Sequence, residues 1–496
     1  MMEILPEQTV MPPLGLITVA ALCPAQWEVR LIDRSLEELQ DSDLLWADLV
    51  MVGAMHVQRE DAHRTLQRAS QLGRRTMIGG PYASSQPDVL LQFADHVVVG
   101  EPDEVFGKIA YDLENGFARR LYRISEKPDI RHTPIPRFEL LRKGKYASMS
   151  LQFSRGCPFQ CEFCDIITIY GRRPRTKSPQ QMIEELEALR RWGWRKEVFI
   201  VDDNFIGNHK LALGLVQEME LWQERNGHPF IFYTEASIDL AFRPELLSSM
   251  VRANFLYVFV GVETTVTQSL KEAKKFQNLR ADPLECIRFI QRRGLWVTAG
   301  FIVGFDSDGP DVFDRQIDFI ERAAIPWAMT GFLQAPPTTP LFDRMAKEGR
   351  LIADSQATSN FSLPNFSTVL PLPELLRGLE RMLKELYEPR KFYQRALHSL
   401  EAWSSRRAIQ HVHAPLAYRF KVVLSSLWRQ GVLSNYRAEY WRFLARVLFR
   451  WGLNAPKTWL GFVLALSGHH FVPYARQVAG ELERERLRSL GTSGGC

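Results

Sequence analysis

The first 129 residues alternate short apolar runs with longer segments of helical spacing. Each apolar run has the length of a strand and is bounded by turn residues, so we expect strands at 27–33, 47–55, 74–80 and 95–101. Strands that alternate with helix-length segments predict a parallel sheet with crossover helices. Residues 1–129 are therefore predicted to form a Rossmann-like α/β domain.

Turn residues close the last two of these runs. Gly79 and Gly80 end one run, and Gly100 and Glu101 end the other. In an open parallel sheet the carboxyl ends of the strands line the ligand crevice, so these four residues are candidate ligand contacts. The alternative is that the glycines only permit tight turns.

The same alternation returns after a Pro-rich linker at 130–142. Six strand-like runs follow within 143–365, at 146–154, 196–203, 230–237, 255–264, 295–305 and 325–335. Six β/α units predict a partial (β/α)6 barrel. Beyond them the spacing is helical, so we expect an α-helical C-terminal domain at 366–486 and a disordered tail at 487–496.

Three of the six cysteines lie within eight residues, at Cys157, Cys161 and Cys164. They follow the first predicted barrel strand, where catalytic loops gather. Thiolates are soft ligands that suit iron–sulfur clusters or zinc, and structural zinc normally needs a fourth ligand, which no nearby Cys or His supplies. A cubane held by three thiolates leaves one iron free to chelate S-adenosylmethionine (SAM).

The C-x3-C-x2-C spacing resembles that of the radical SAM superfamily. The resemblance implies a [4Fe–4S] cluster and a 5′-deoxyadenosyl radical formed from SAM. It also implies that Asp202 or Asp203 holds the SAM amino group, an alternative that the sequence leaves open. The remaining implied SAM contacts are Glu235, Ser237 and Glu263 for the ribose and carboxylate, and Gly300, Ile302 and Gly304 for the adenine. For each of these residues, the competing interpretation is a strand-end turn or buried packing.

The wider pattern resembles cobalamin-binding radical SAM enzymes, in particular the subgroup that includes the hopanoid C-2 methylases. The matching segments include PPLG, GGP, GVET and GFIVGFD. The resemblance implies that Gly79, Gly80, Gly100 and Glu101 contact cobalamin. It further implies a C-methyltransferase in which methylcobalamin delivers the methyl group to an apolar, lipid-like or terpenoid-like substrate radical.

Two features depart from that family. Its cobalamin domain normally opens with a strand and loop before PPLG, whereas Met1 lies only a few residues upstream of this segment. We therefore expect either a misassigned start or poor cobalamin binding. The D-x-H-x-x-G cobalamin-ligand pattern is also absent from the sequence. His56 follows a strand, and we weigh a contact on the cobalt side against ordinary packing.

Other functions stay open. Oxidative cyclases of tetrapyrrole pathways share the architecture but transfer no methyl group, and a degenerate, non-catalytic docking protein is a further alternative. The net charge of +5 is small for 496 residues, and no RNA-binding motif is legible, so we expect no nucleic-acid partner. Residues 172–177 are basic, which fits either a solvated loop or a contact for an acidic flavodoxin-type or ferredoxin-type reductant.

The location of the protein is inferred from its apolar segments. The sequence shows neither a secretion signal nor 18 consecutive apolar residues, so we expect a cytoplasmic protein. Residues 441–453 mix arginines with aromatic side chains. This segment is either packed on the barrel or forms a peripheral contact at the inner membrane surface.

Overall fold

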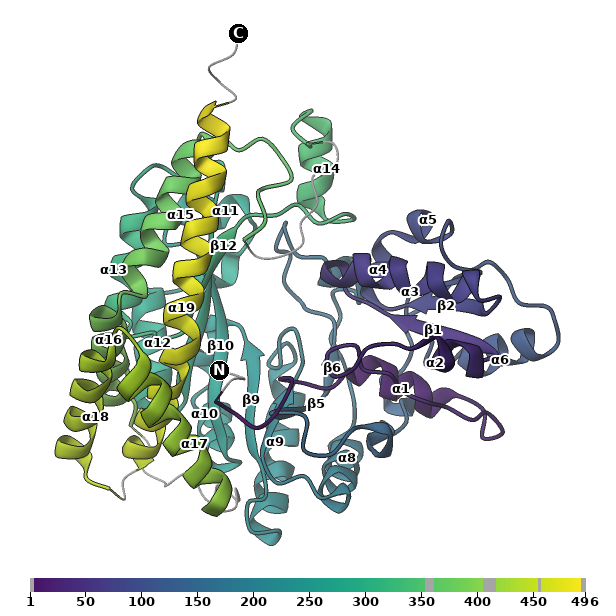
Figure 1. The fold of residues 1–496 in the computed structure, drawn as a ribbon, viewed down its shortest axis with the longest axis horizontal. Coiled ribbons are helices and arrows are strands. Elements are labelled where there is room, and N and C mark those ends of the chain that lie inside the picture. The colour runs from purple at the N-terminus through teal and green to yellow at the C-terminus, as the bar shows by residue number, and fades with distance from the viewer. Residues whose placement is uncertain (1–3, 353–360, 405–415, 454–455, 492–496) are drawn as a thin grey trace.

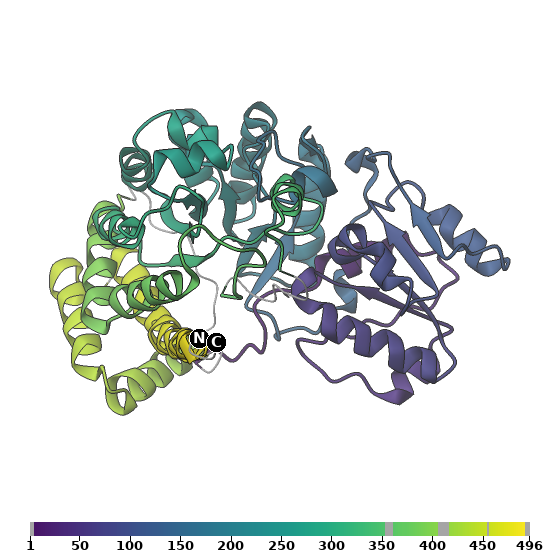
Figure 2. The same ribbon diagram turned by 90° about the horizontal axis from the view of Figure 1, so that it is seen from above.

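The computed structural model describes residues 4–352, 361–404, 416–453 and 456–491. An α/β domain, a six-stranded barrel and a group of helices follow one another along the chain. Seen from above they form an arc, with the N-terminal domain at one end and the C-terminal helices at the other (Figure 2).

The N-terminal domain is built on a four-stranded parallel sheet of order β1-β2-β3-β4. Its strands are β1 (Leu49–Gly53), β2 (Arg75–Gly79), β3 (His96–Val99) and β4 (Leu121–Arg123). The intervening helices are α3 (Arg59–Gln71), α4 (Pro81–Ser85), α5 (Pro87–Leu90) and α6 (Phe106–Glu114). Leu66, Ile78 and Val97 are fully buried between the helices and the sheet. The predicted Rossmann-like layout is therefore confirmed.

The strand predicted at 27–33 is wrong. This segment is in no sheet of the described residues. Its side chains are used for other contacts, because the Trp27 indole donates to Glu114 (2.7 Å) and Asp33 accepts from the Tyr146 hydroxyl (3.0 Å). An apolar run becomes a strand only where a neighbouring edge supplies ladder hydrogen bonds.

The segment before α1 (Leu14–Leu22) also lies outside this sheet. Thr9 instead forms a parallel bridge with Tyr146, beside the first barrel strand. Backbone hydrogen bonds from Gln8 to Lys145 (2.9 Å) and from Ala147 to Thr9 (3.0 Å) hold the segment there. The N-terminal residues therefore extend along the barrel edge.

The barrel sheet contains all six predicted strands, paired in parallel in the order β12-β11-β10-β9-β8-β5. They are β5 (Ser148–Leu151), β8 (Glu197–Ile200), β9 (Ile231–Ala236), β10 (Phe255–Glu263), β11 (Trp296–Val303) and β12 (Ala328–Phe332). The covering helices include α8 (Pro179–Trp192), α9 (His209–Arg225), α10 (Pro244–Arg252), α12 (Pro283–Arg292) and α13 (Val312–Arg322). A short hairpin of β6 (Ser154–Arg155) and β7 (Arg175–Thr176) follows β5. Strands β5 and β12 form the two edges of the partial barrel.

Helix α8 begins and ends where local chemistry dictates. The Ser178 hydroxyl accepts from the backbone N–H of Gln181 (3.1 Å), and Pro179 occupies the first turn. Gly193 ends the helix with a left-handed φ of 102°.

The strands bury one face under the helices and keep the other partly exposed. In β9, Phe232 and Thr234 are fully buried, whereas Tyr233 and Glu235 are partly exposed. The same alternation continues in β10. Because successive side chains point to opposite faces, the partly exposed residues share the inner face of the barrel.

The C-terminal region is helical, as predicted. It comprises α15 (Leu372–Leu386), α16 (Pro389–Ala402), α17 (Leu416–Trp428), α18 (Arg437–Trp451) and α19 (Pro456–Gly491), whereas α14 (Pro340–Lys347) lies within the range predicted for the barrel domain. Helix α19 lies along α15 on the β12 side of the barrel (Figure 1). The disordered tail predicted at 487–496 is wrong for 487–491, because α19 continues to Gly491 and charged pairs such as Arg488–Glu485 support it. Residues 492–496 lie outside the described residues.

Candidate active site

The three cysteines lie on the loop that follows β5. Cys161 is buried and Cys157 and Cys164 are partly exposed, and all three are free thiols. Gly156 turns the loop with a φ of 94°, and a Cβ there would lie 2.7 Å from the Gly171 carbonyl. Burial raises the pKa of Cys157 and of Cys164, so their thiolates need a positive partner. An iron cluster supplies that charge, and the loop fits it.

Two side-chain amides approach these sulfurs. Gln277 Nε2 lies 3.6 Å from Cys161 Sγ, and Asn204 Nδ2 lies 3.9 Å from Cys157 Sγ. Sequence reasoning missed both roles, because Gln277 is distant in the chain and only the fold brings it to the loop. Within the described ranges, no three His, Cys, Asp or Glu side chains are grouped to hold a single metal ion. In a [4Fe–4S] cubane each cysteine binds a different iron.

The adjacent carboxylates after β8 have different surroundings. Asp202 is buried and accepts hydrogen bonds from the Phe153 backbone (2.7 Å) and the Ser154 hydroxyl (2.6 Å), so it ties β8 to the cluster loop. Asp203 is partly exposed, and burial together with the charges of Asp202, Glu235 and Asp165 raises its pKa to about 7. Of the two, Asp203 is the carboxylate available to a ligand.

Glu235 and Glu263 extend this acidic region across β9 and β10. Burial and the charge of Glu263 raise the pKa of Glu235 to about 7. Glu263 has a left-handed φ of 64°, which is rare outside glycine, and its carboxylate pairs with the buried Lys275. A Cβ at Gly261 would meet the Glu263 carboxylate and lie 2.7 Å from Lys275 Nζ. The ion pair therefore requires a glycine in β10.

Ser237 lies beside the cluster loop. Its backbone N–H and its hydroxyl both donate to Asn204 Oδ1, at 3.1 and 3.2 Å. Asn204 thus connects the end of β9 with Cys157.

The predicted adenine contacts are on β11. Gly300 and Ile302 are partly exposed, whereas Phe301 and Val303 are buried, so the first two face the barrel interior. A Cβ at Gly300 would lie 3.0 Å from the Phe259 ring. Gly304 turns the chain after the strand with a φ of 105°, and its N–H donates to Asp308 Oδ2 (2.9 Å). Their contact with SAM stays a prediction.

The loops after β1, β2 and β3 are the candidate cobalamin face. Gly79 ends β2, and Gly80 follows it with a φ of 93°. Gly100 has a φ of 94°, and a Cβ there would lie 2.5 Å from the Ile124 carbonyl, so packing alone requires this glycine. His56 Nε2 lies 3.1 Å from Arg59, while its buried Nδ1 has no hydrogen-bond partner among the described residues.

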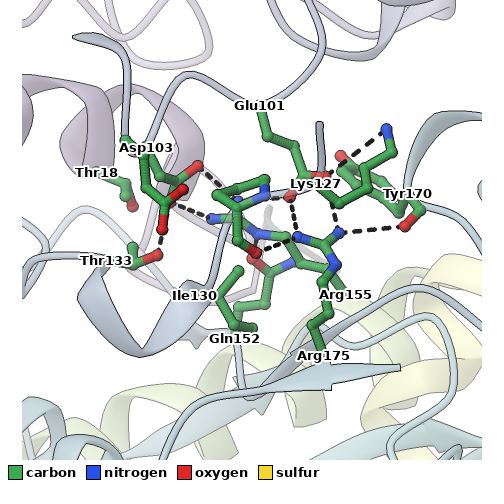
Figure 3. A network of polar contacts seen from close by, with 12 residues as sticks. Thr18, Glu101, Asp103, Lys127, Ile130, Thr133, Gln152, Arg155, Tyr170 and Arg175 are labelled. Atoms are coloured by element: carbon green, nitrogen blue, oxygen red, sulfur yellow. Dashed lines mark hydrogen bonds and ion pairs between the residues drawn. The ribbon is translucent and has the colours of Figure 1, made fainter. Parts of the chain in front are cut away.

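Glu101, which we expected to contact cobalamin, lies in a charged cluster between the domains (Figure 3). Its carboxylate accepts from Arg155 (2.9 Å) and from Arg175 (2.7 and 3.0 Å). Lys177, from the same basic run as Arg175, is buried against Glu185. Arg172 and Arg173 are the exposed members of that run.

Comparison with known proteins identifies the chain. A B12 binding domain model matches residues 8–110, a radical SAM superfamily model matches 151–320, and a domain of unknown function (DUF4070) matches 339–484. An uncharacterized methyltransferase of Synechocystis sp. is 38% identical over 98% of this chain and 91% of the relative. The hopanoid C-2 methylase of Rhodopseudomonas palustris is 35% identical over 95% of this chain and 89% of the relative.

The chain belongs to the cobalamin-binding radical SAM family. Its cofactors are a [4Fe–4S] cluster, SAM and cobalamin. The fold agrees with the structure of the radical SAM methyltransferase TsrM from Kitasatospora setae, at a TM-score of 0.65 and 15% identity over 89% of this chain and 99% of that chain. None of the described helices is long and apolar enough to span a membrane.

Proposed function

We propose that this enzyme is a cobalamin-dependent C-methyltransferase that acts on an apolar, lipid-like or terpenoid-like substrate. The observation that carries the substrate class is a ladder of aromatic rings on the inner face of the barrel. Phe199 stacks on Tyr233 at 4.7 Å between ring centroids, and Tyr233 stacks on Tyr257 at 4.5 Å. Such a surface binds apolar molecules through burial of their surface against the rings.

The ladder continues to the C-terminal helices. Tyr257 contacts Trp327 at 6.0 Å, and Trp327 stacks on Phe471 of α19 at 5.8 Å. Tyr233 of the ladder and Glu235 are two residues apart on the inner face of β9. Their Cα atoms are therefore about 7 Å apart along the strand. A substrate resting on these rings would lie beside the acidic side chains assigned to SAM.

The residues of the chain divide the work around the cofactors. Cys157, Cys161 and Cys164 would hold the cluster, and Asp203 and Glu235 would face the cationic SAM. Burial and the charges of neighbouring carboxylates raise the pKa of both groups, and the SAM amino and sulfonium groups would provide the positive charge that favours their ionised forms. When bound, the cluster and SAM supply the radical, and cobalamin carries the methyl group.

For cobalamin, the chain offers the loops at the carboxyl end of the N-terminal sheet. Met55 and Val57 are exposed apolar side chains there, and His56 Nδ1 is a buried nitrogen without a partner among the described residues. Gly79 at the end of β2 and Gly80 after it allow close approach of a ligand to the backbone. Glu101 remains a cobalamin contact only through its backbone, because its carboxylate is held by arginines.

Anaerobic turnover with methyl-labelled SAM tests this function. The reconstituted enzyme is supplied with cobalamin, a low-potential reductant and hopanoid, other terpenoid or tetrapyrrole substrates. We expect label in an apolar product together with 5′-deoxyadenosine. Formation of 5′-deoxyadenosine with an unlabelled, cyclised tetrapyrrole would support the oxidative cyclase instead. An intact cluster with neither product would support a docking role.

We also propose that Arg172 and Arg173 receive an acidic flavodoxin-type or ferredoxin-type reductant. Both side chains are exposed on the loop that follows the cysteines. A charge-reversed double variant, Arg172→Glu with Arg173→Glu, should raise the apparent KM for flavodoxin and leave turnover with dithionite unchanged. Equal dependence on flavodoxin in the variant and the wild type would discard this role.

A peripheral membrane contact is proposed for α18. Phe449 is 96% exposed, and Leu453 just beyond the helix is 88% exposed. Exposed arginines recur at every fourth residue along one side of the helix, at Arg442, Arg446 and Arg450. Exposed apolar groups flanked by cations fit an anionic lipid surface.

Vesicle sedimentation tests this contact. The full-length enzyme should sediment with anionic phospholipid vesicles and remain in solution with neutral phosphatidylcholine vesicles. Phe449→Glu should abolish sedimentation, whereas Arg315→Ala, on the exposed side of α13, should not. Lack of binding to anionic vesicles at low salt would refute the contact, and a concentration-dependent dimer lost in Phe449→Glu would assign the surface to a second copy.

A further inference from the structure

An ion-pair cluster connects the cobalamin-binding domain with the loop that carries the three cysteines. Arg155 lies at the centre of this ion-pair cluster (Figure 3). The Arg155 guanidinium donates to Glu101 (2.9 Å) and makes two hydrogen bonds to Asp103 (2.7 and 3.1 Å). Its Nε donates to Gln152 Oε1 (2.8 Å) within the cluster loop, which fixes the orientation of the side chain. Arg155 therefore binds both sides of the domain boundary at once.

A second arginine repeats this connection. Arg175 on β7 binds both carboxylate oxygens of Glu101 and also donates to the carbonyls of Pro128 (2.9 Å) and Tyr170 (3.1 Å). Lys127 lies 3.9 Å from Glu101 and donates to the Ile169 carbonyl (2.5 Å). Residues 127–128, which lead into the linker, thus meet the cobalamin-binding domain and the cysteine loop at a single carboxylate.

The ion-pair cluster is shielded from water. The side chains of Glu101 and Asp103 are 4% exposed, that of Arg155 is 11% exposed and that of Arg175 is 15% exposed. Burial opposes ionisation, yet hydrogen bonds and charge from Arg155 lower the pKa of Asp103 below its ordinary value. Charges in such a setting hold a fixed geometry, and loss of one partner leaves the other buried without compensation.

The ion-pair cluster lies between the two cofactor sites. Glu101 comes two residues after β3, at the sheet end that faces cobalamin, and Arg155 comes two residues before Cys157. One side-chain contact therefore separates the cobalamin loops from the first cluster ligand. We propose that Glu101, Asp103 and Arg155 are positioning residues that hold the two cofactor sites at one separation and orientation. This inference rests on the proposed methyl transfer between those sites.

Catalytic coupling provides the first test. Glu101→Gln keeps the shape of the side chain and lies outside the cysteine loop. We expect the variant to retain its iron content and 5′-deoxyadenosine formation, while methylated product per 5′-deoxyadenosine falls by about 10²-fold, as a displacement of about 1 Å can cause. Asp103→Asn should behave alike. The double variant Glu101→Gln/Arg155→Gln should lose no more coupling than the single variants, because all three act in one cluster.

The second test needs no cofactor. If the ion-pair cluster holds the domains together, the linker should open more often in Glu101→Gln than in the wild type. Limited proteolysis of the cofactor-free, full-length variant should then cut faster near residues 127–138, at the start of the linker. Arg315→Ala removes an exposed ion pair within α13 and serves as the matched control, with wild-type proteolysis and coupling.

The outcomes distinguish the positioning role from the proposed methyl transfer. An unchanged product ratio and unchanged proteolysis in Glu101→Gln would overturn the positioning role. Loss of the iron–sulfur absorption in Glu101→Gln and Asp103→Asn would also overturn it, because the residues would then support folding of the loop. If the wild type transfers no methyl group, the proposed function fails, and faster linker cleavage in Glu101→Gln would still establish the contact between the domains.

Discussion

Two neighbouring aspartates at the end of β8 have opposite tasks. Asp202 is satisfied by the Phe153 N–H and the Ser154 hydroxyl, whereas Asp203 is surrounded by other carboxylates. The first arrangement stabilises the cluster loop. The second is unfavourable until a cation arrives, which is the property expected of a site for SAM.

Substitution of each aspartate should separate these tasks. Asp203→Asn should weaken SAM binding by about 10-fold to 100-fold, the equivalent of one hydrogen bond to a charged group. Asp202→Asn should lower the free energy of unfolding by about 1–3 kcal/mol, because one of the two acceptor oxygens in a buried hydrogen-bond network is replaced by a donor, and leave SAM affinity of the folded protein unchanged. Equilibrium dialysis and denaturant unfolding measure the two effects. Unaltered SAM affinity in Asp203→Asn would remove this residue from the site.

The same carboxylates predict how stability depends on pH. The pKa of Asp203 and that of Glu235 are about 7 in the folded protein, above the ordinary values of 3.8 and 4.5. A raised folded-state pKa means that the native state binds more protons, so the cofactor-free protein should lose stability as pH rises from about 4 to about 7. SAM affinity should rise over the same interval as the carboxylates ionise.

Thermal unfolding from about pH 4 to about pH 8, with and without SAM, checks this dependence. Asp203→Asn and Glu235→Gln should each flatten the profile of the cofactor-free protein. A profile that keeps its slope in the double variant would assign the titration to other groups.

At the scale of elements, strand β10 is shaped by the ion pair at its end. Gly261 leaves room for Glu263 and Lys275, and an added Cβ would lie within 3 Å of both. Gly261→Ala should therefore destabilise the protein by about 1–3 kcal/mol through overpacking and displace the Glu263 carboxylate. Gly214→Ala is the control, since nothing lies within 4 Å of a Cβ there in α9, and it should stabilise by about 0.4–1 kcal/mol. Urea unfolding compares them, and equal stability of the two variants would contradict the packing argument.

The elements that sequence patterns predicted are those with a strong local signal. All six barrel strands were predicted, because continuous apolar runs between turns identify buried parallel strands. The run at 27–33 has the same local pattern and yet lies in no sheet, because strand formation also needs a partner edge. Strand β4 was missed because its three residues are too short for a periodic signal.

In the candidate site, too, the residues with a local sequence signal were predicted and those that depend on tertiary contacts were not. The cysteine triplet is legible from spacing, since its ligands lie on one loop. The groups that surround it come from two other segments, Asn204 after β8 and Lys275 with Gln277 after α11, and only tertiary structure brings them to the sulfurs and to Glu263. Likewise, sequence named Glu101 for its place after a strand, but its arginine partners lie more than 50 residues away.

At the scale of the whole molecule, the C-terminal helices complete the barrel. The sheet ends at β12, and α19 lies along that side (Figure 1). The Trp327 indole donates to Ser467 Oγ (2.8 Å), and Phe471 of the same helix stacks on Trp327. The aromatic ladder that begins on β8 is therefore finished by a helix more than 250 residues away, so the C-terminal region belongs to the proposed substrate surface.

Phe471→Ala tests this contribution. Removal of the ring takes away one aromatic contact, worth about 0.5–1.5 kcal/mol, and leaves space at the end of the ladder. The apparent KM for the apolar substrate should rise by about 2-fold to 10-fold, and more 5′-deoxyadenosine should form without methylation, because the substrate is held less firmly near the radical. SAM affinity should not change, since Asp203 and Glu235 are on other elements.

Leu487→Ala, an exposed position of α19, controls for general effects on the helix. If Phe471→Ala lowers stability while its kinetics match those of Leu487→Ala, α19 supports the barrel without contacting substrate, and the aromatic surface ends at Trp327.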